Sequence, residues 1–152
     1  MRLAIVACLV LQIHAQPYTP ANNNQLRNGL GNCPTTSPCD TIEDWNVTLV
    51  QDFSNLFYDI HNFDHDLSKW DVSGVTKMDF IFSNTGNFNS DLTKWDVSGV
   101  TEMSGAFRES VNFTANVSTW NVQQVTSFSS LFFDTQNFQG KVNYWNLNDP
   151  FT

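Results

Sequence analysis

Apolar positions recur along this chain at a fixed interval of 25 residues from Trp45 onward. One unit, Trp70 to Lys94, reads W-D-V-S-G-V-T-K-M-D-F-I-F-S-N-T-G-N-F-N-S-D-L-T-K. A fixed period between about 20 and 50 residues is typical of solenoids, in which each unit buries its apolar face against its neighbours. The spacing predicts a structural ladder of five stacked indoles: Trp45, Trp70, Trp95, Trp120 and Trp145.

The apolar spacing changes inside each unit and suggests two kinds of element. Residues 70–72 alternate apolar and polar, which predicts a short strand. From Val75 to Phe82 the apolar steps are three, three and one, which predicts about two helical turns with Thr76 and Asp79 as a capping pair. We therefore expect an α/β solenoid of strand-helix coils over 45–152, comprising 45–69, 70–94, 95–119, 120–144 and a partial coil at 145–152.

A polar column accompanies the apolar ones, just before an inward phenylalanine in each unit. Its side chains are amides, which can hydrogen-bond the backbone of adjacent coils at the turn. We expect a structural asparagine ladder, with contact to a glycan or other ligand as the alternative. The column contains Asn62, Asn87, Asn112 and Asn137.

The first residues resemble a secretory signal. Arg2 precedes a short apolar run that ends at Ala15, and this run is too short to span a bilayer. We expect a signal peptide over 1–15 and an exported chain, with lipidation at Cys8 as the alternative. Residues 16–44 are expected to form an irregular lead-in and an N-terminal cap.

Two cysteines lie close together in that cap, within C-P-T-T-S-P-C. In an exported protein such a pair indicates a disulfide more readily than a metal site or a redox centre. Closing so short a loop should contribute roughly 2 kcal/mol, which can hold a cap but not a fold. We expect a disulfide between Cys33 and Cys39.

The charge balance limits the partners. Beyond the signal the chain has six Lys and Arg against fifteen Asp and Glu, a net charge of about −9. Such a chain is repelled by phosphate backbones and by anionic membranes. We expect neither nucleic acid nor membrane insertion, and instead a protein or glycan partner outside the cell.

The pattern W-D-V-S-x-V-T-x-M-x-x-x-F-x-x-x-x-x-F-N-x-D-L-[ST]-K-W at 70–95 closely resembles the repeat of BspA-family leucine-rich-repeat surface proteins. The resemblance covers about two thirds of the chain. It implies a leucine-rich-repeat-like, right-handed stack that is secreted or displayed on the cell surface and acts in adhesion or host interaction. It implies no catalytic residues.

Candidate chemistry is sparse. Outward acidic columns that include Asp66, Asp71, Asp91 and Asp96 form a solvated face, with Ca²⁺ binding as the alternative. His61 and His65 lie in one coil without the partners of a triad or of a two-histidine metal site. We expect no enzyme, no metal and no cofactor.

Modification and binding depend on the surface. Three N-glycosylation acceptors occur, to be used if the host is eukaryotic: Asn46, Asn116 and, less favourably placed in the ladder, Asn112. Surface aromatics that differ from unit to unit are candidate partner contacts, namely Tyr58, Phe80 and Phe133, although partial packing on a neighbouring coil explains them equally well.

Two functions follow from this reading. The first is a secreted or surface binding and adhesion module that uses one face of the stack. The second is a structural protein that associates end to end through an uncapped C-terminal coil, because an open end exposes strand edges and apolar rungs.

Overall fold

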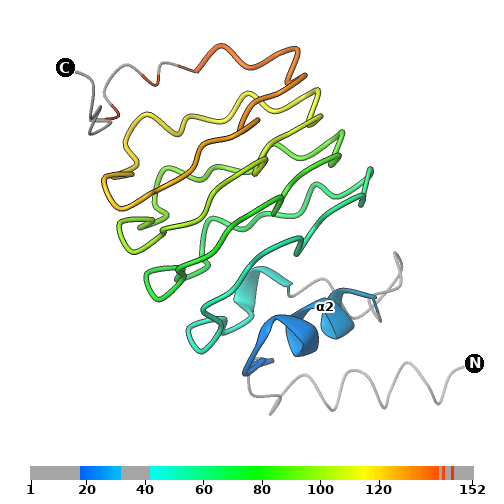
Figure 1. Ribbon diagram of the computed structural model, residues 1–152. Coiled ribbons are helices and arrows are strands. Elements are labelled where there is room, and N and C mark those ends of the chain that lie inside the picture. The colour runs from blue at the N-terminus through cyan, green and yellow to red at the C-terminus, as the bar shows by residue number, and fades with distance from the viewer. Residues whose placement is uncertain (1–17, 32–41, 141, 143–144, 146–152) are drawn as a thin grey trace, which may run out of the picture.

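The computed structural model describes residues 18–31, 42–140, 142 and 145. Two short helices precede the repeats, the α-helix α2 (Asn23–Gly31) and the 3₁₀ helix η1 (Ile42–Asp44). The rest of the described chain winds in irregular coils that lie one above another, with α2 beside the first coil (Figure 1). The structure is thus a compact repeat stack with few helices or strands.

Among the described residues, β-pairing between coils takes the form of isolated parallel bridges, which join Asp52 to Lys77, Lys77 to Glu102 and Glu102 to Ser127. The strand expected at 70–72 is wrong. The Val75 N–H donates to the Val72 carbonyl at 2.9 Å, so the segment turns instead of extending. Alternation over three residues is too short to distinguish a strand from such a turn.

The helix expected from Val75 to Phe82 is also wrong. Phe80 has a φ of 54°, which a right-handed helix excludes. Its N–H donates to the Ser104 carbonyl of the next coil at 2.9 Å, as the N–H of Phe82 does to Ala106. These donors therefore join coils, whereas in a helix they would bond the preceding turn.

Consecutive turns account for the apolar spacing that suggested a helix. The N–H of Ile81 donates to Met78 at 3.3 Å, and the N–H of Ser83 donates to Phe80 at 3.2 Å. Bonds between residues i and i+3 place side chains on one side at nearly helical intervals. Periodicity alone could not separate the two conformations.

The expected capping pair also joins coils. The Thr76 hydroxyl donates to the Gln51 carbonyl at 3.2 Å, and the same bond recurs from Thr101 to Thr76 and from Thr126 to Thr101. Asp79 Oδ1 accepts the Ser104 N–H at 2.7 Å. Side chains that would begin a helix instead bind the neighbouring coil.

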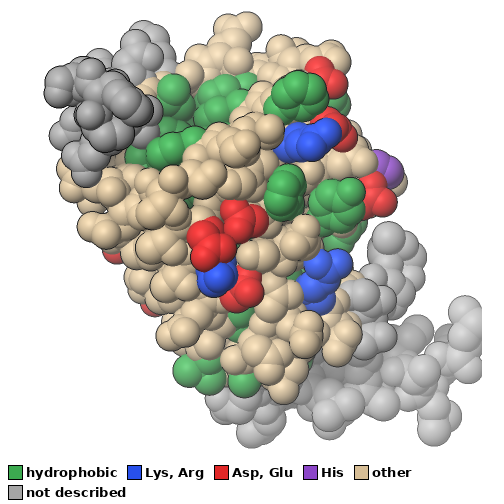
Figure 2. All heavy atoms as spheres, in the orientation of Figure 1, with side chains coloured by type: hydrophobic (Ala, Val, Ile, Leu, Met, Phe, Trp, Pro, Cys, Tyr) green, Lys and Arg blue, Asp and Glu red, His purple; other side chains and the backbone are tan. Residues whose placement is uncertain are grey.

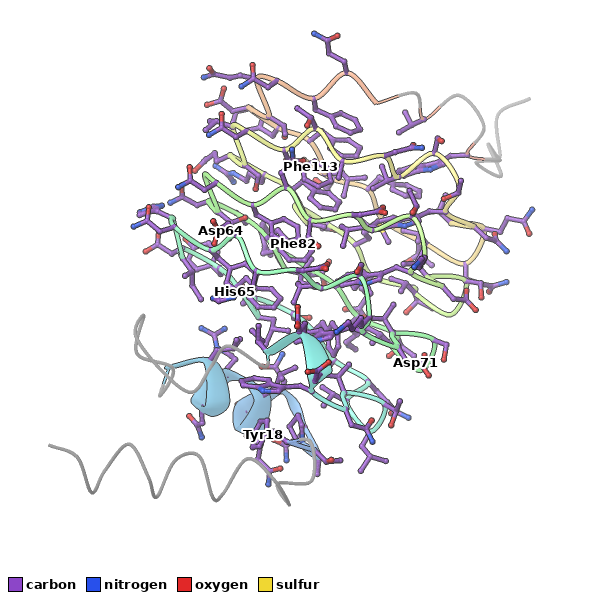
Figure 3. The ribbon with its side chains drawn as sticks, turned by 180° about the vertical axis from the view of Figure 1, so that it is seen from behind. Tyr18, Asp64, His65, Asp71, Phe82 and Phe113 are labelled. Atoms are coloured by element: carbon purple, nitrogen blue, oxygen red, sulfur yellow. The ribbon has the colours of Figure 1, made fainter. Side chains whose placement is uncertain are left out.

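A long ladder of aromatic rings fills the interior. The rings of Phe57, Phe82, Phe107 and Phe132 stack at centroid distances of 5.2, 5.6 and 5.6 Å. A second column packs against the first, with Phe82 and Phe88 only 3.9 Å apart. Figure 3 shows Phe82 and Phe113 inside the stack. The second column comprises Phe63, Phe88, Phe113 and Phe138.

The tryptophans form a further column. The indoles of Trp95, Trp120 and Trp145 are nearly parallel, at 6.4 and 6.5 Å. Each buried indole also donates its Nε1–H to a carbonyl 28 residues earlier, as Trp95 does to Leu67 at 3.0 Å. The same bond links Trp70 to Ile42, Trp120 to Leu92 and Trp145 to Val117.

A buried hydroxyl column was not anticipated from the sequence. Thr85 and Ser110 donate to the Phe82 carbonyl, and Thr135 donates to the Phe107 carbonyl. Thr85 and Ser110 are fully buried. Within the described residues every buried side-chain polar atom has a hydrogen-bond partner, so the core holds polar groups among its apolar side chains without leaving them unpaired.

The helix α2 closes the N-terminal end of the stack, in a segment that we expected to be irregular. Leu26 is fully buried against the core, while Asn23 Nδ2 donates to the carbonyls of Asp52 and Ser54 at 2.9 and 3.0 Å. In later coils those carbonyl positions accept backbone N–H groups from the preceding coil. In the first coil, the side-chain amide of Asn23 thus takes the place of the backbone N–H groups that a preceding coil supplies to later coils.

Other expectations about the N-terminus lie outside the described residues, namely the signal peptide over 1–15 and the disulfide between Cys33 and Cys39. Within the described cap, Lys69 Nζ donates to Asp44 of η1 at 3.0 Å, which ties the first coil to η1. No helix in the described part of the chain has the length and apolar content that crossing a membrane requires.

Candidate functional site

The surface that varies from coil to coil carries the exposed aromatics. Tyr58 and Phe133 are 48% and 57% exposed, and the Arg108 guanidinium carbon lies 5.2 Å from the centre of the Phe133 ring. Phe80 is partly buried. We call Tyr58, Phe80, Arg108 and Phe133 the aromatic face.

Phe80 is held in place by a glycine. Any Cβ atom on Gly105 would collide with the Phe80 ring, so the ring lies directly over that glycine in the next coil. The alternative weighed from the sequence, packing on a neighbouring coil, therefore describes Phe80. Tyr58 and Phe133 keep large accessible surfaces and are the better placed of the three expected contacts.

Most basic side chains are paired. Lys77 and Glu102 lie 2.8 Å apart, and Arg108 and Glu109 lie 2.9 Å apart. The contact with Glu102 raises the pKa of Lys77, and that with Lys77 lowers the pKa of Glu102. Figure 2 shows basic side chains next to acidic and apolar ones on one face of the stack.

The carboxylates of the outward acidic columns accept hydrogen bonds from the backbone two residues further on. Asp71 Oδ1 accepts the hydroxyl and the N–H of Ser73 at 2.7 and 3.1 Å, and these bonds lower the pKa of Asp71. Asp91 binds Thr93 in the same way, and its pKa is lowered for the same reason. The same side chain-to-backbone turn is formed by Asn46, Asp66, Asp96, Asn116 and Asn121.

These carboxylates are therefore spread along the outside of the stack, one for each turn, as the position of Asp71 in Figure 3 illustrates. The described residues include no group of three or more His, Cys, Asp or Glu side chains that could hold a metal ion.

The asparagine column forms a partial ladder. Asn87 Nδ2 donates to Asn62 Oδ1 at 3.4 Å, and Asn137 Nδ2 donates to Asn112 Oδ1 at 3.3 Å. The side chains thus bond each other, whereas we expected them to bond the backbone. All four are exposed.

The three glycosylation acceptors are exposed as well. Asn46 Oδ1 accepts the Thr48 hydroxyl at 2.7 Å, and Asn116 Oδ1 accepts the Ser118 N–H at 3.0 Å. Asn112 shares its side-chain oxygen with Asn137. The first two sequons thus form turns on the outside of the stack, whereas the third belongs to the ladder.

His61 and His65 lie on the surface of one coil. His61 Nδ1 lies 3.0 Å from the Asn84 carbonyl and its Nε2 lies 3.6 Å from Asp59. The His65 ring lies 5.4 Å from Phe63. The structure does not bring the two rings into a common site.

Two polar hollows interrupt the surface, and sequence reasoning missed both. The larger, about 540 Å³, lies between α2 and the first coil and includes Asn23, Arg27 and Asp52. The smaller, about 420 Å³, lies between two later coils and includes Asp64, Asp66 and Asp91. Each is lined by two segments that are distant from one another in the sequence, so no local motif marks them.

At the C-terminal end of the described stack, three backbone donors lack the partners that their equivalents have in the coil before. In the preceding coil, the N–H groups of Gly105, Phe107 and Glu109 donate to carbonyls of the next coil at 2.8 to 3.0 Å. The equivalent donors one coil later have no acceptor among the described residues. They are the N–H groups of Ser130, Phe132 and Asp134.

The comparisons with known proteins give a family without an activity. Neither the search of curated proteins nor the search of solved structures found a match. A family model matches residues 25–149, which include α2 from Gln25 onward and all the described coils. The chain therefore belongs to the family described as Mycoplasma protein of unknown function, DUF285.

Proposed function

We propose that this chain is an exported binding module, secreted or held at the cell surface, that binds a protein or glycan through its aromatic face. The observation that carries the proposal is the exposure of Tyr58 and Phe133 on coils whose cores are otherwise alike. Solenoids bind through surfaces that vary over a repeated core.

The chemistry of this face suits recognition. Exposed aromatic side chains bury a large area with little loss of conformational entropy. Arg108 adds a cation beside the Phe133 ring, while its ion pair with Glu109 fixes its position. The resemblance to BspA-family leucine-rich-repeat surface proteins supports the same role, and a leucine-rich-repeat-like solenoid is the fold that it implies.

The experiment is a pull-down from extracellular material, run beside a glycan array, with the wild-type protein and with Tyr58→Ala and Phe133→Ala. Leu49→Ala is the matched control, because Leu49 is 60% exposed in a different turn. We expect the two aromatic substitutions to weaken binding about tenfold or more and the control to leave it unchanged. Equal binding by all variants would reject the aromatic face.

Structural self-association is the second candidate. The N–H groups of Ser130, Phe132 and Asp134, which have no acceptor among the described residues, favour it. A partner at this end must offer carbonyl acceptors. At the N-terminal end of another copy, Asn23 already occupies the carbonyls of Asp52 and Ser54. Light scattering over a range of concentrations tests the idea, and a constant monomer mass would exclude it.

A further inference from the structure

We propose that the hollow between α2 and the first coil binds a sugar that carries a carboxylate, with Arg27 as the residue that binds the carboxylate. The hollow adjoins one end of the aromatic face, because the Asn55 carbonyl that accepts Arg27 also accepts the Tyr58 N–H at 3.2 Å. The proposal does not depend on the function proposed above.

Polar and charged residues line the hollow. It has a volume of about 540 Å³, which suits one or two sugar rings. Its lining has no apolar side chain, so an apolar ligand would gain little from entering. The lining residues are Asn22, Asn23, Asn24, Arg27, Asp52, Ser54 and Asn55.

Arg27 supplies an available cation. Its Nη1 donates to the Asn55 carbonyl at 2.6 Å, which fixes the side chain at the hollow while leaving other guanidinium N–H groups free to donate. Among the described residues it forms no ion pair, whereas Lys69, Lys77 and Arg108 each pair with a carboxylate. A guanidinium is suited to bind a carboxylate through two parallel hydrogen bonds.

The remaining side chains suit hydroxyl groups. Asn22 uses its oxygen to accept the Gln25 N–H at 3.0 Å, which leaves its NH₂ group available. Asp52 uses Oδ1 to accept the Ser54 N–H at 2.8 Å, which leaves Oδ2 available. Asn24 and Asn55 are exposed and add further amide groups. Sugar hydroxyls both donate and accept, so they match this mixture.

The charges in the hollow are balanced before a ligand binds. Arg27 is the one basic residue in its lining and Asp52 the one acidic residue, so a carboxylate must bind at the guanidinium and away from Asp52. The second hollow provides a contrast within the same molecule. It contains Asp64, Asp66 and Asp91 without a basic residue, so it repels a carboxylated sugar.

The test is titration of the purified protein by calorimetry and by NMR shifts with three probes: sialyllactose, lactose and sodium acetate. Sialyllactose has both the carboxylate and the hydroxyls, lactose has hydroxyls alone, and acetate has a carboxylate alone. We expect sialyllactose to bind and to shift the amides around Arg27, with each of the other probes at least tenfold weaker.

Arg27→Gln removes the charge but retains a donor for the Asn55 carbonyl, and we expect it to weaken sialyllactose binding about tenfold. Lys94→Gln is the matched control for net charge and should bind like wild type. Asn24→Ala, which removes an exposed amide with no structural bond, should also weaken binding.

Phe133→Ala, at the other end of the aromatic face, should leave sialyllactose binding unchanged, which separates this site from that face. No binding of sialyllactose, equal binding of lactose, or unchanged binding by Arg27→Gln would overturn the proposal. Equal binding of acetate would reduce the hollow to a simple anion contact and would overturn it as well.

Discussion

The indole Nε1 of Trp95 donates to the Leu67 carbonyl at 3.0 Å, and the same oxygen accepts the backbone N–H of Trp70 at 3.0 Å. One carbonyl thus closes a turn in its own coil and binds the next tryptophan in the ladder. Trp95 is 3% exposed, so its ring packs in the core while its nitrogen joins two coils.

Replacing Trp95 should separate these two roles. Trp95→Phe keeps an aromatic ring but removes the donor to Leu67, and we expect a loss of about 1–2 kcal/mol in the free energy of unfolding. Trp95→Ala also leaves a cavity and should lose about 3–5 kcal/mol. Urea denaturation measures both. A loss below about 1 kcal/mol for Trp95→Ala would contradict the structural role of the indole.

Gly105 should tolerate no side chain while Phe80 is present. The φ of Gly105 is 61°, but Asn55, Phe80 and Ser130 occupy the same column with φ values of 57°, 54° and 56°. Positive φ therefore does not require glycine here. Glycine is required because a new Cβ at this position would collide with the Phe80 ring. We expect Gly105→Ala to lose about 1–3 kcal/mol of stability.

A double variant identifies the cause of that loss. In Phe80→Ala the ring is absent, so adding Gly105→Ala to it should cost about 1 kcal/mol or less. The coupling is read from thermal or urea unfolding of the two single variants and the double variant. Equal effects of Gly105→Ala in both backgrounds would show that backbone strain, not the ring, demands glycine.

Asn23 should protect the first coil selectively. Asn23→Ala removes two hydrogen bonds to the carbonyls of Asp52 and Ser54, and Asn24→Ala is a neighbouring control without such bonds. We expect amide hydrogen exchange to accelerate in Asn23→Ala at Phe53 and Leu56 but not in coils beyond Val100. Uniform acceleration throughout the stack would instead mean that α2 contributes only to global stability.

The stack was predictable because the tryptophan interval is exact, and an exact interval has few structural explanations. The conformation within a coil was not. The apolar steps from Val75 to Phe82 fit a helix and a series of turns equally well, and Phe80 adopts positive φ without the glycine that usually signals it. Bonds to the next coil decide the outcome, and they depend on residues about 25 positions away.

The same limit applied to the candidate sites. Tyr58 and Phe133 could be chosen from their variation between units, because a solenoid keeps its core constant. The hollow beside α2 could not, since Arg27 and Asn55 are brought together only when the helix packs on the first coil. That helix is short and rich in asparagine, and Leu26 is the buried apolar side chain that anchors it.

The carboxylates of Asp71 and Asp96, which accept hydrogen bonds in the turns on the outside of the stack, should make the stability of the stack sensitive to acid. Bonds from Ser73 and Ser98 lower the pKa of Asp71 and Asp96 in the folded protein. Because the folded pKa lies below the unfolded value of about 3.9, their contribution to stability is present above that pH and is lost as the pH falls through the folded pKa.

Asparagine fills the same column at Asn46 and Asn121 with the same turn, so the double change Asp71→Asn and Asp96→Asn should preserve the backbone. We expect a change within about 0.5 kcal/mol at neutral pH, where the substitution also removes the repulsion between the two carboxylates. Between about pH 5 and pH 2 the variant should lose less stability than wild type.

Urea denaturation across this pH range measures the difference, and Ser73→Ala provides an independent check. That substitution removes the hydroxyl donor to Asp71 but leaves the backbone donor, so it should reduce the acid sensitivity only in part. Parallel pH profiles for the double variant and wild type would show that other groups govern acid unfolding. The outward acidic columns would then contribute little to the stability of the coils.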